Sequence, residues 1–403
     1  MLIGNWKKVA ASAIMVSAFT AMPALADEVG VDTENKIVTI GAFTPITGPV
    51  PFYATLTHAS EAYFMRLNET GEVDGWTFNF ITRDDGYDPA RSVAVARSLV
   101  EDDEIFALAA PLGTATNVAV IPYANEAGIP IIGPVGGASV FFVEPSVFPL
   151  LPDYGWSAAS SLDYAVNGLD LTKVALLWEN DELGRSAKRG FDLYMEDLGM
   201  EAVESIPFDV STTSFSAHIR RVANSGAEAV ILFGSNANLA GALRAADLQA
   251  LDVEWFAPFF TADPSTLNLA GDLLEGVHFS SWLLPVSSDE PEVVAYRAAV
   301  EEFFPGDPLG VLGLNGWSNA ALFHHGFQLL LDSGMDITRE NLITVMNTME
   351  NAAIGGARGV TFEPDDHRGT RQEGIIQYKD GDFVLVREFQ PYPAVVFDTA
   401  AAE

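Results

Sequence analysis

The chain has 403 residues, no cysteine and a formal net charge of −34 at pH 7. So acidic a surface repels nucleic acid and anionic lipid, and the lack of cysteine excludes a disulfide framework, thiolate chemistry and a lipid anchor on cysteine. With 49% hydrophobic residues, the composition is that of a folded protein rather than a disordered one.

Residues 1–26 are typical of a cleavable secretory signal. Lys7 and Lys8 precede an apolar run that ends at Met22 and is too short and too interrupted for a membrane span. We therefore expect an exported protein that begins near Asp27, most simply in the periplasm of a Gram-negative bacterium. About 377 residues then remain, and at roughly 150 residues per domain this length predicts two domains.

The strong negative charge also predicts a marine or salt-adapted source. An exported protein meets the salt of its medium, and a short Debye length makes many like charges tolerable. The alternative is an acidic surface that only aids solubility. We expect the melting temperature to rise between low and seawater-like NaCl in thermal unfolding, and a flat melting temperature would favour the alternative.

The first part of the chain alternates strands and helices. The hydrophobic pattern predicts strands at 37–43, 77–82, 105–110 and 129–132, and helices at 55–67, at 90–102 and in a stretch that ends at Ala127. Such alternation specifies a parallel sheet that is covered by helices on both faces.

The same pattern restarts after residues 148–156, which are rich in proline and aromatic side chains. It predicts strands at 173–178, 229–233, 254–257 and 276–280, and helices at 184–198, 214–224, 237–249, 293–304 and 318–333. The end of the chain is β-rich, with strands at 359–362, 375–379 and 383–387 and a hairpin turn at Asp380-Gly381. The predicted fold class is α/β, with two doubly wound lobes and a late return of the chain to the first.

Two turns at the ends of neighbouring strands carry residues that bind small anions through backbone amides. They are 111–114, with Gly113 and Thr114, and 133–137, with Gly136 and Gly137. Where a parallel strand ends and a helix begins, free N–H groups and the helix dipole favour a carboxylate or a phosphate. Two such turns could hold one carboxylate between them, although Gly-rich turns also serve as plain scaffold in doubly wound proteins.

No motif of an enzyme, a metal site or a cofactor site is found. The nucleophile elbow, the phosphate-binding loop, the zinc-protease motif and the dinucleotide fingerprint are all absent. His324 and His325 are adjacent in a predicted helix and point about 100° apart, so they do not easily share a metal. The acidic turn at 84–89 lacks the Gly and the distal Glu of a calcium loop and is better explained as a turn and helix cap. We therefore expect no catalysis, no metal and no cofactor.

Several short motifs occur together in a particular order and spacing: 41–50 (GAFTPITGPV), 84–89 (DDGYDP), 111–114 (PLGT), 128–134 (GIPIIGP), 268–276 and 359–365. Through them the chain resembles the type I periplasmic binding proteins. More narrowly, it resembles the leucine/isoleucine/valine-binding group that serves branched-chain amino acid ABC transporters.

The resemblance implies two lobes joined by a hinge of three crossovers, with a ligand enclosed between them by hinge closure. We place the crossovers near Pro152, Trp282 and Gly356. The predicted first lobe is 27–151 plus 283–355, and the second is 152–282 plus 356–403.

The resemblance also implies that one lobe grips the ligand carboxylate through the two turns. Matched position by position, the turns are Leu112, Gly113 and Thr114, and Val135, Gly136 and Gly137. Thr114 and the backbone amides are the expected donors, and the Val135 carbonyl is an expected acceptor. Tyr53 and Tyr154 are expected to line the pocket.

The chain departs from the group where the ligand ammonium is bound. Phe259 stands where an acidic residue is usual, and Ser235 where an aromatic residue is common. A buried ammonium without a carboxylate partner loses several kcal/mol, of which aromatic faces recover only ~1–2 kcal/mol. Either the ligand is an apolar or aromatic acid without an ammonium, or Asp263 or Asp153 binds the ammonium. In the first case the acid packs against aromatic side chains, namely Tyr53, Tyr154, Trp156, Phe259, Phe260, Trp282 and Trp317.

The sequence thus predicts the solute-binding component of an ABC importer, a monomer that captures a small carboxylate-bearing ligand. Its partners are that ligand and the permease subunits, and not nucleic acid. One alternative is the ligand-sensing protein of a signalling system. A more remote one is an exported α/β enzyme, which turnover of a bound ligand would reveal.

Overall fold

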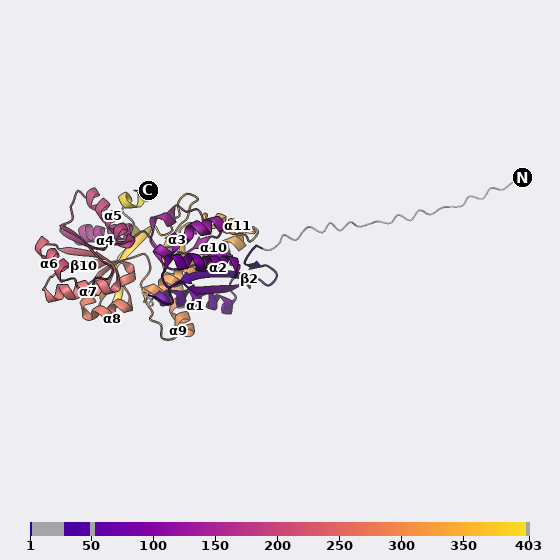
Figure 1. Cartoon of the computed structure of the whole chain (residues 1–403), viewed down its shortest axis with the longest axis horizontal. Helices are drawn as coiled ribbons and strands as arrows, with labels where there is room; N and C mark the ends of the chain where they lie inside the picture. The colour runs from indigo at the N-terminus through magenta and orange to yellow at the C-terminus, as the bar shows by residue number, and fades with distance from the viewer. Residues whose placement is uncertain (2–27, 49–52, 400–403) are drawn as a thin grey trace.

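The computed structural model describes residue 1, residues 28–48 and residues 53–399. Two sheets, each covered by helices, lie side by side (Figure 1). Apart from Met1, the predicted signal lies outside the described residues. In the described part of the chain, no helix is long and apolar enough to cross a membrane.

The first sheet is mainly parallel and is built around β2, which pairs with β3 and β4 in parallel and with β1 antiparallel. Beyond β4 follow β5 and β6, again in parallel. Its strands are β1 (Val31–Asp32), β2 (Ile37–Thr44), β3 (Thr77–Asp84), β4 (Ala107–Ala109), β5 (Ile131–Ile132) and β6 (Val147–Phe148). β4 is shorter than predicted because the Ile105 amide donates back to Leu99 of the preceding helix.

Helices from two separate parts of the chain cover this sheet. They are α1 (Ala54–Thr70), α2 (Pro89–Glu101), α3 (Thr114–Ala127), α9 (Pro291–Phe303), α10 (Val311–Ser333) and α11 (Arg339–Met346). α9 and α10 pack on α1, so the chain does return late to its first lobe (Figure 1). α10 begins at Val311 rather than Ser318, because its first turns are buried all round and show no amphipathic period.

The second sheet has the strand order β15-β14-β11-β10-β9-β7-β8. Its strands are β7 (Val174–Glu179), β8 (Glu204–Phe208), β9 (Ala229–Phe233), β10 (Glu254–Ala257), β11 (His278–Ser281), β14 (Gln372–Lys379) and β15 (Asp382–Pro391). The strand β8 was not predicted, because it is a half-buried edge strand with a weak apolar pattern. The predicted hairpin joins β14 to β15, and Asp380 and Gly381 both have the positive φ that such a turn requires.

The helices of the second sheet include α4, which starts in the stretch that the sequence suggested was a connection. They are α4 (Tyr154–Asp163), α5 (Glu182–Asp197), α6 (Ser216–Ser225), α7 (Asn236–Leu248), α8 (Pro264–Ala270) and α12 (Ala394–Thr399). α4 forms there because the Asp153 carboxylate caps it, accepting a hydrogen bond from the Gly155 amide.

The chain passes between the two sheets after β6, after β11 and after the small hairpin of β12 (Ala352–Ile354) and β13 (Ala357–Val360). A continuous buried apolar cluster joins the two sides and includes Ile132, Phe256 and Trp282. The predicted fold class, two α/β lobes with three connections, is confirmed.

Candidate functional site

The two predicted anion turns lie directly against each other. Leu112 and Val135 form a parallel bridge just beyond the paired ends of β4 and β5. The Gly113 amide donates to the Val135 carbonyl (2.9 Å), and the Val135 amide donates to Pro111 (2.9 Å). The Gly113 amide is thus already bonded, whereas the Val135 carbonyl keeps a second lone pair, and its expected role as an acceptor stays a prediction. Thr114 is the first residue of α3, where the free amides of the helix begin.

The second turn is pressed against the first turn and against α4. A Cβ atom on Gly136 would lie 2.8 Å from the Thr114 Cα, and one on Gly137 would lie 2.9 Å from the Tyr154 ring. Glycine is required at both positions because no side chain fits in that space.

Three tyrosines from separate elements gather beside Thr114. Tyr53 precedes α1, Tyr87 follows β3, and Tyr154 starts α4 and shares a hydrogen bond with the Thr114 hydroxyl. The ring centroids of Tyr53 and Tyr87 are 6.4 Å apart. Burial raises the pKa of Tyr87 to about 12 and raises the pKa values of Tyr53 and Tyr154 further, so all three hydroxyls stay neutral.

Tyr87 was not predicted as a site residue, because the acidic turn after β3 was explained only as a turn and helix cap. The position of Tyr87 in the sequence could have indicated that it belongs to the site. Tyr87 follows the carboxyl end of a strand that neighbours β2, and the ends of parallel strands meet at one edge of the sheet.

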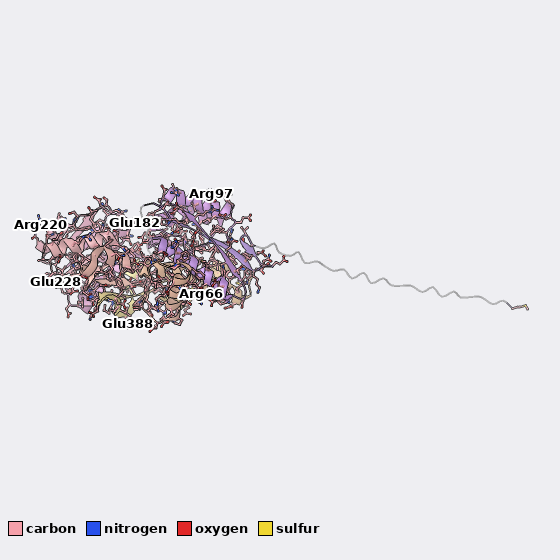
Figure 2. The ribbon with its side chains drawn as sticks, turned by 90° about the horizontal axis from the view of Figure 1, so that it is seen from below. Arg66, Arg97, Glu182, Arg220, Glu228 and Glu388 are labelled. Carbon is pink, nitrogen blue, oxygen red and sulfur yellow. The ribbon has the colours of Figure 1, made fainter. Side chains whose placement is uncertain are left out.

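Two carboxyl groups of the second lobe act electrostatically on these tyrosines. Glu179 is the last residue of β7, and Asp181 caps α5 by accepting from the Gly184 amide (3.0 Å). Burial, and then the charge of Asp181 and a hydrogen bond to it, raise the pKa of Glu179 to about 8. In Figure 2, Glu182, next to Asp181, lies between Arg220 of this lobe and Arg97 of the other, as expected for the boundary between the lobes.

Electrostatic interactions link the carboxyl groups of the second lobe to the tyrosines. The Glu179 carboxyl contributes to the raised pKa of both Tyr53 and Tyr87, and Asp181 contributes to those of Tyr87 and Tyr154. We call this set the interlobe group: Tyr53, Tyr87, Thr114, Tyr154, Glu179 and Asp181. Glu179 and Asp181 were not predicted from the sequence.

Ser235, singled out from the sequence, lies next to Glu179. Its hydroxyl donates to Asn238 Oδ1 (2.6 Å) in a capping box at the start of α7, and its amide also bonds the Glu179 carboxyl. The hydroxyl of Ser235 is therefore committed to the helix cap.

Phe259 belongs to an aromatic row that leads to Tyr154. Its ring lies 5.6 Å from Trp282 and 5.5 Å from Phe260, and Phe260 lies 6.1 Å from Tyr154. Phe259 is only 2% exposed. Trp156 and Trp317, in contrast, have core contacts. Their indole nitrogens donate to Val396 (3.1 Å) and Glu292 (3.3 Å) respectively.

Asp263 and Asp153 are engaged in structural bonds. The Asp263 carboxylate caps α8 through Ser265 and accepts a weak bond from Leu312 at the start of α10 (3.4 Å). The Asp153 carboxylate accepts from Ser139 Oγ (2.8 Å) and Ser186 Oγ (2.7 Å), besides capping α4. Both precede helices, where free amides attract a carboxylate. Both carboxylates therefore serve as helix caps, and the expected role of either residue in binding an ammonium stays a prediction.

A family described as periplasmic binding protein matches residues 37–382. The chain belongs to this family. Leu/Ile/Val-binding protein homolog 6 of Brucella suis is 26% identical over 302 residues, or 73% of this chain and 74% of that one. The resemblance predicted from the motifs is confirmed, and since the family consists of binding proteins, the chain is not an enzyme.

Two solved structures share the fold closely. A branched-chain amino acid ABC transporter protein from Thermus thermophilus, with bound valine, has a TM-score of 0.80 and 22% identity, and the match covers 91% of this chain and 99% of that one. A fatty acid ABC transporter substrate-binding protein from Thermomonospora curvata has a TM-score of 0.80 and 21% identity, with 92% and 96% covered. The fold is that of the type I periplasmic binding proteins.

Proposed function

We propose that this periplasmic binding protein is the substrate-binding component of an ABC importer. In this proposal it holds a small carboxylate-bearing ligand between its lobes and delivers it to the permease subunits. The observation that carries the proposal is the pair of bridged turns at Leu112 and Val135, which places Thr114 and the first amides of α3 beside three tyrosines.

The chemistry of the turns supports the carboxylate. The first amides of α3 have no acceptor within the helix, and the Thr114 hydroxyl adds a side-chain donor at the same point. Neutral tyrosine hydroxyls add further donors and exclude water, which strengthens each bond to a charged group. The role of each of these residues in binding stays a prediction.

Closure between two lobes is part of the proposal. We propose lobes of 27–151 with 283–355 and of 152–282 with 356–403, joined at the three chain crossings. Asp153, bonded to Ser139 before the first crossing and to Ser186 in α5, lies where such a hinge would move. The ligand is an apolar acid or an amino acid, in line with the fatty acid and the valine named for the two similar structures.

The direct test is to identify what the protein carries. Protein purified from its own host without dialysis is analysed by native mass spectrometry, and the bound mass is then confirmed by titration calorimetry. We expect a small molecule with a carboxylate group. A stoichiometric ligand without one, or binding that persists when Thr114 and Tyr154 are both replaced, would contradict the proposal.

We also expect Gly136→Ala to weaken ligand binding by about tenfold or more, because the new methyl group would push against the backbone at Thr114 and displace the α3 amides. The measurement is titration calorimetry of the ligand found above. Gly241→Ala in α7 is the control, since its methyl group would meet only the Phe215 side chain at 3.2 Å and ordinary contacts beyond. Equal affinities of the two variants would remove the second turn from the site.

A further inference from the structure

Helix α10 of the first lobe has no cap of its own. Its N-cap residue is Gly310, which has no side chain to accept a hydrogen bond from the first amides of the helix. The acceptor comes from the second lobe, where Asp263 Oδ2 accepts from the amide of Leu312 (3.4 Å), the second residue of α10. An N-cap side chain bonds the amide at this position or the next one. Asp263 therefore takes the place of the missing cap.

The same carboxylate also caps α8 in its own lobe. Asp263 Oδ1 accepts from the Ser265 amide (3.0 Å) and from the Ser265 hydroxyl (2.8 Å). One oxygen thus bonds within the second lobe, while the other bonds to the first lobe. The side chain is only 3% exposed, and a buried carboxylate depends on such donors for its stability. Asp263 therefore joins α8 to α10 across the boundary between the lobes.

The first lobe is shaped to receive this carboxylate. A Cβ atom on Gly310 would lie 2.1 Å from Asp263 Oδ2 and 2.8 Å from the Pro264 ring. The φ of Gly310 is −137°, which any residue adopts, so the close approach of the second lobe is what requires glycine here. Tyr296 of α9 holds Gly310 in place, since its hydroxyl donates to the Gly310 carbonyl (3.0 Å) and accepts from the Gly310 amide (3.2 Å).

The surfaces beside this contact leave room for movement. A groove of about 290 Å³ is lined by Pro264 and Leu267 of the second lobe and by Arg297 and Leu309 of the first. Figure 1 shows α8 and α9 next to each other on the same side of the boundary between the lobes. The bond from Asp263 to α10 thus lies at the edge of an open groove between the lobes.

We propose that Asp263 is a latch between the lobes. Its carboxylate caps α10 from the second lobe and so favours the lobe arrangement seen here over arrangements in which α8 and α10 are apart. When the two helices separate, α10 loses the acceptor for its first amides, which costs free energy. In this assignment Asp263 is a positioning residue that acts on the lobes and does not touch the ligand. The hydrogen bonds that form the latch involve no residue of the interlobe group.

The latch also affects ligand binding. A ligand that is enclosed between the lobes binds one arrangement of them, so its apparent affinity is scaled by the fraction of the protein in that arrangement. This consequence rests on the proposed function. The latch itself is a property of the ligand-free protein and is tested there.

The test measures the distance between the lobes. Because the chain has no cysteine, Leu269→Cys on α8 and Val294→Cys on α9, which are 48% and 43% exposed, can carry spin labels for double electron–electron resonance. Bound ligand is first removed by dialysis against mild denaturant. Asp263→Ala should shift the distances to longer values, because the equilibrium constant for the latched arrangement falls by about threefold to tenfold.

Hydrogen exchange separates the latch from a plain helix cap. In Asp263→Ala the peptide that spans the start of α10 should exchange faster than in the wild type, since the Leu312 amide has lost its acceptor. The double variant Asp263→Ala/Gly310→Ser gives α10 a cap of its own. It should restore slow exchange at the start of α10 but not the shorter distance between the labels.

Two single variants act on the two sides of the carboxylate. Gly310→Ala keeps the bonds to Ser265 but pushes Asp263 away from α10, so it should lengthen the distances as Asp263→Ala does. Ser265→Ala is the matched control, because it removes a hydrogen bond to the same carboxylate on the α8 side only. It should leave the distances unchanged. Urea unfolding shows that each variant is folded, and Gly310→Ala decides if Asp263→Ala is not.

Distances that stay the same in Asp263→Ala and Gly310→Ala overturn the latch. A lengthening in Ser265→Ala as large as that in Asp263→Ala overturns it too, since the effect would then belong to the α8 cap alone. The proposed function is judged separately by Thr114→Val, which tests the carboxylate turns. It can fail while the labels still report a latch, and a missing latch leaves those turns unaffected.

Discussion

Thr114→Val should weaken ligand binding by about 1–3 kcal/mol, which is roughly tenfold to a hundredfold in the dissociation constant. Valine has nearly the same shape as threonine, so the turn and its contact with Gly136 are kept. The hydroxyl that stands at the start of α3 and bonds to Tyr154 is lost, and the ligand carboxylate is left short of a donor. Titration calorimetry of the co-purified ligand measures the change.

Thr344→Val is the control for this substitution. Thr344 lies on α11, and its hydroxyl bonds only to the Glu340 carbonyl of the same helix (2.9 Å). The control should bind ligand like the wild type, and both variants should unfold at similar denaturant concentrations. A dissociation constant that Thr114→Val leaves unchanged would take Thr114 out of the site.

Phe259→Glu should lower the free energy of unfolding by about 3–5 kcal/mol near neutral pH. The new carboxyl group would replace a 2% exposed ring between Phe260 and Trp282, with no cation among its ring contacts. Burial would raise its pKa above the value of an unfolded glutamate. The loss should therefore be smallest below about pH 4 and should grow as pH rises towards the folded-state pKa. Urea unfolding between about pH 4 and about pH 8 measures it.

Phe259→Leu separates the charge from the lost volume. Leucine removes part of the ring contacts and should cost less, with no dependence on pH. If Phe259→Glu is as stable as Phe259→Leu at all pH values, the side chain is not enclosed as the structure has it. In that case the strand end after β10 could again be a site for an acidic residue.

Much of the fold could be predicted because its signals are local. β9 and β10 begin and end where the apolar runs predicted them, and the hairpin at Asp380-Gly381 follows from two residues that accept a positive φ. α10 was predicted too short because its first turns are buried on all sides, and β8 was missed because it is partly exposed. In both elements the hydrophobic periodicity on which such predictions depend is lost.

The candidate site was predictable only on one side. The two turns lie on strands that are close in sequence, so their meeting at Leu112 and Val135 follows from the pairing of β4 and β5. Tyr87 could have been added by the same reasoning about strand ends. The hydrogen bond between the Gly113 amide and the Val135 carbonyl could not be predicted from the sequence, since it depends on how closely the two turns approach each other.

The sequence by itself determined the α/β class and the family resemblance, and it singled out the two glycine-containing turns and Phe259 as candidate site positions. These depend on neighbours in the chain or on motifs read in order. Only the tertiary structure showed that Glu179 and Asp181 act electrostatically on the tyrosines of the other lobe, and only it committed Asp153 and Asp263 to helix caps. The reason is that contacts between the lobes depend on how the chain crosses from one sheet to the other, and a pKa shift depends on how deeply the group is buried. Neither the chain path nor the burial is a local property of the sequence.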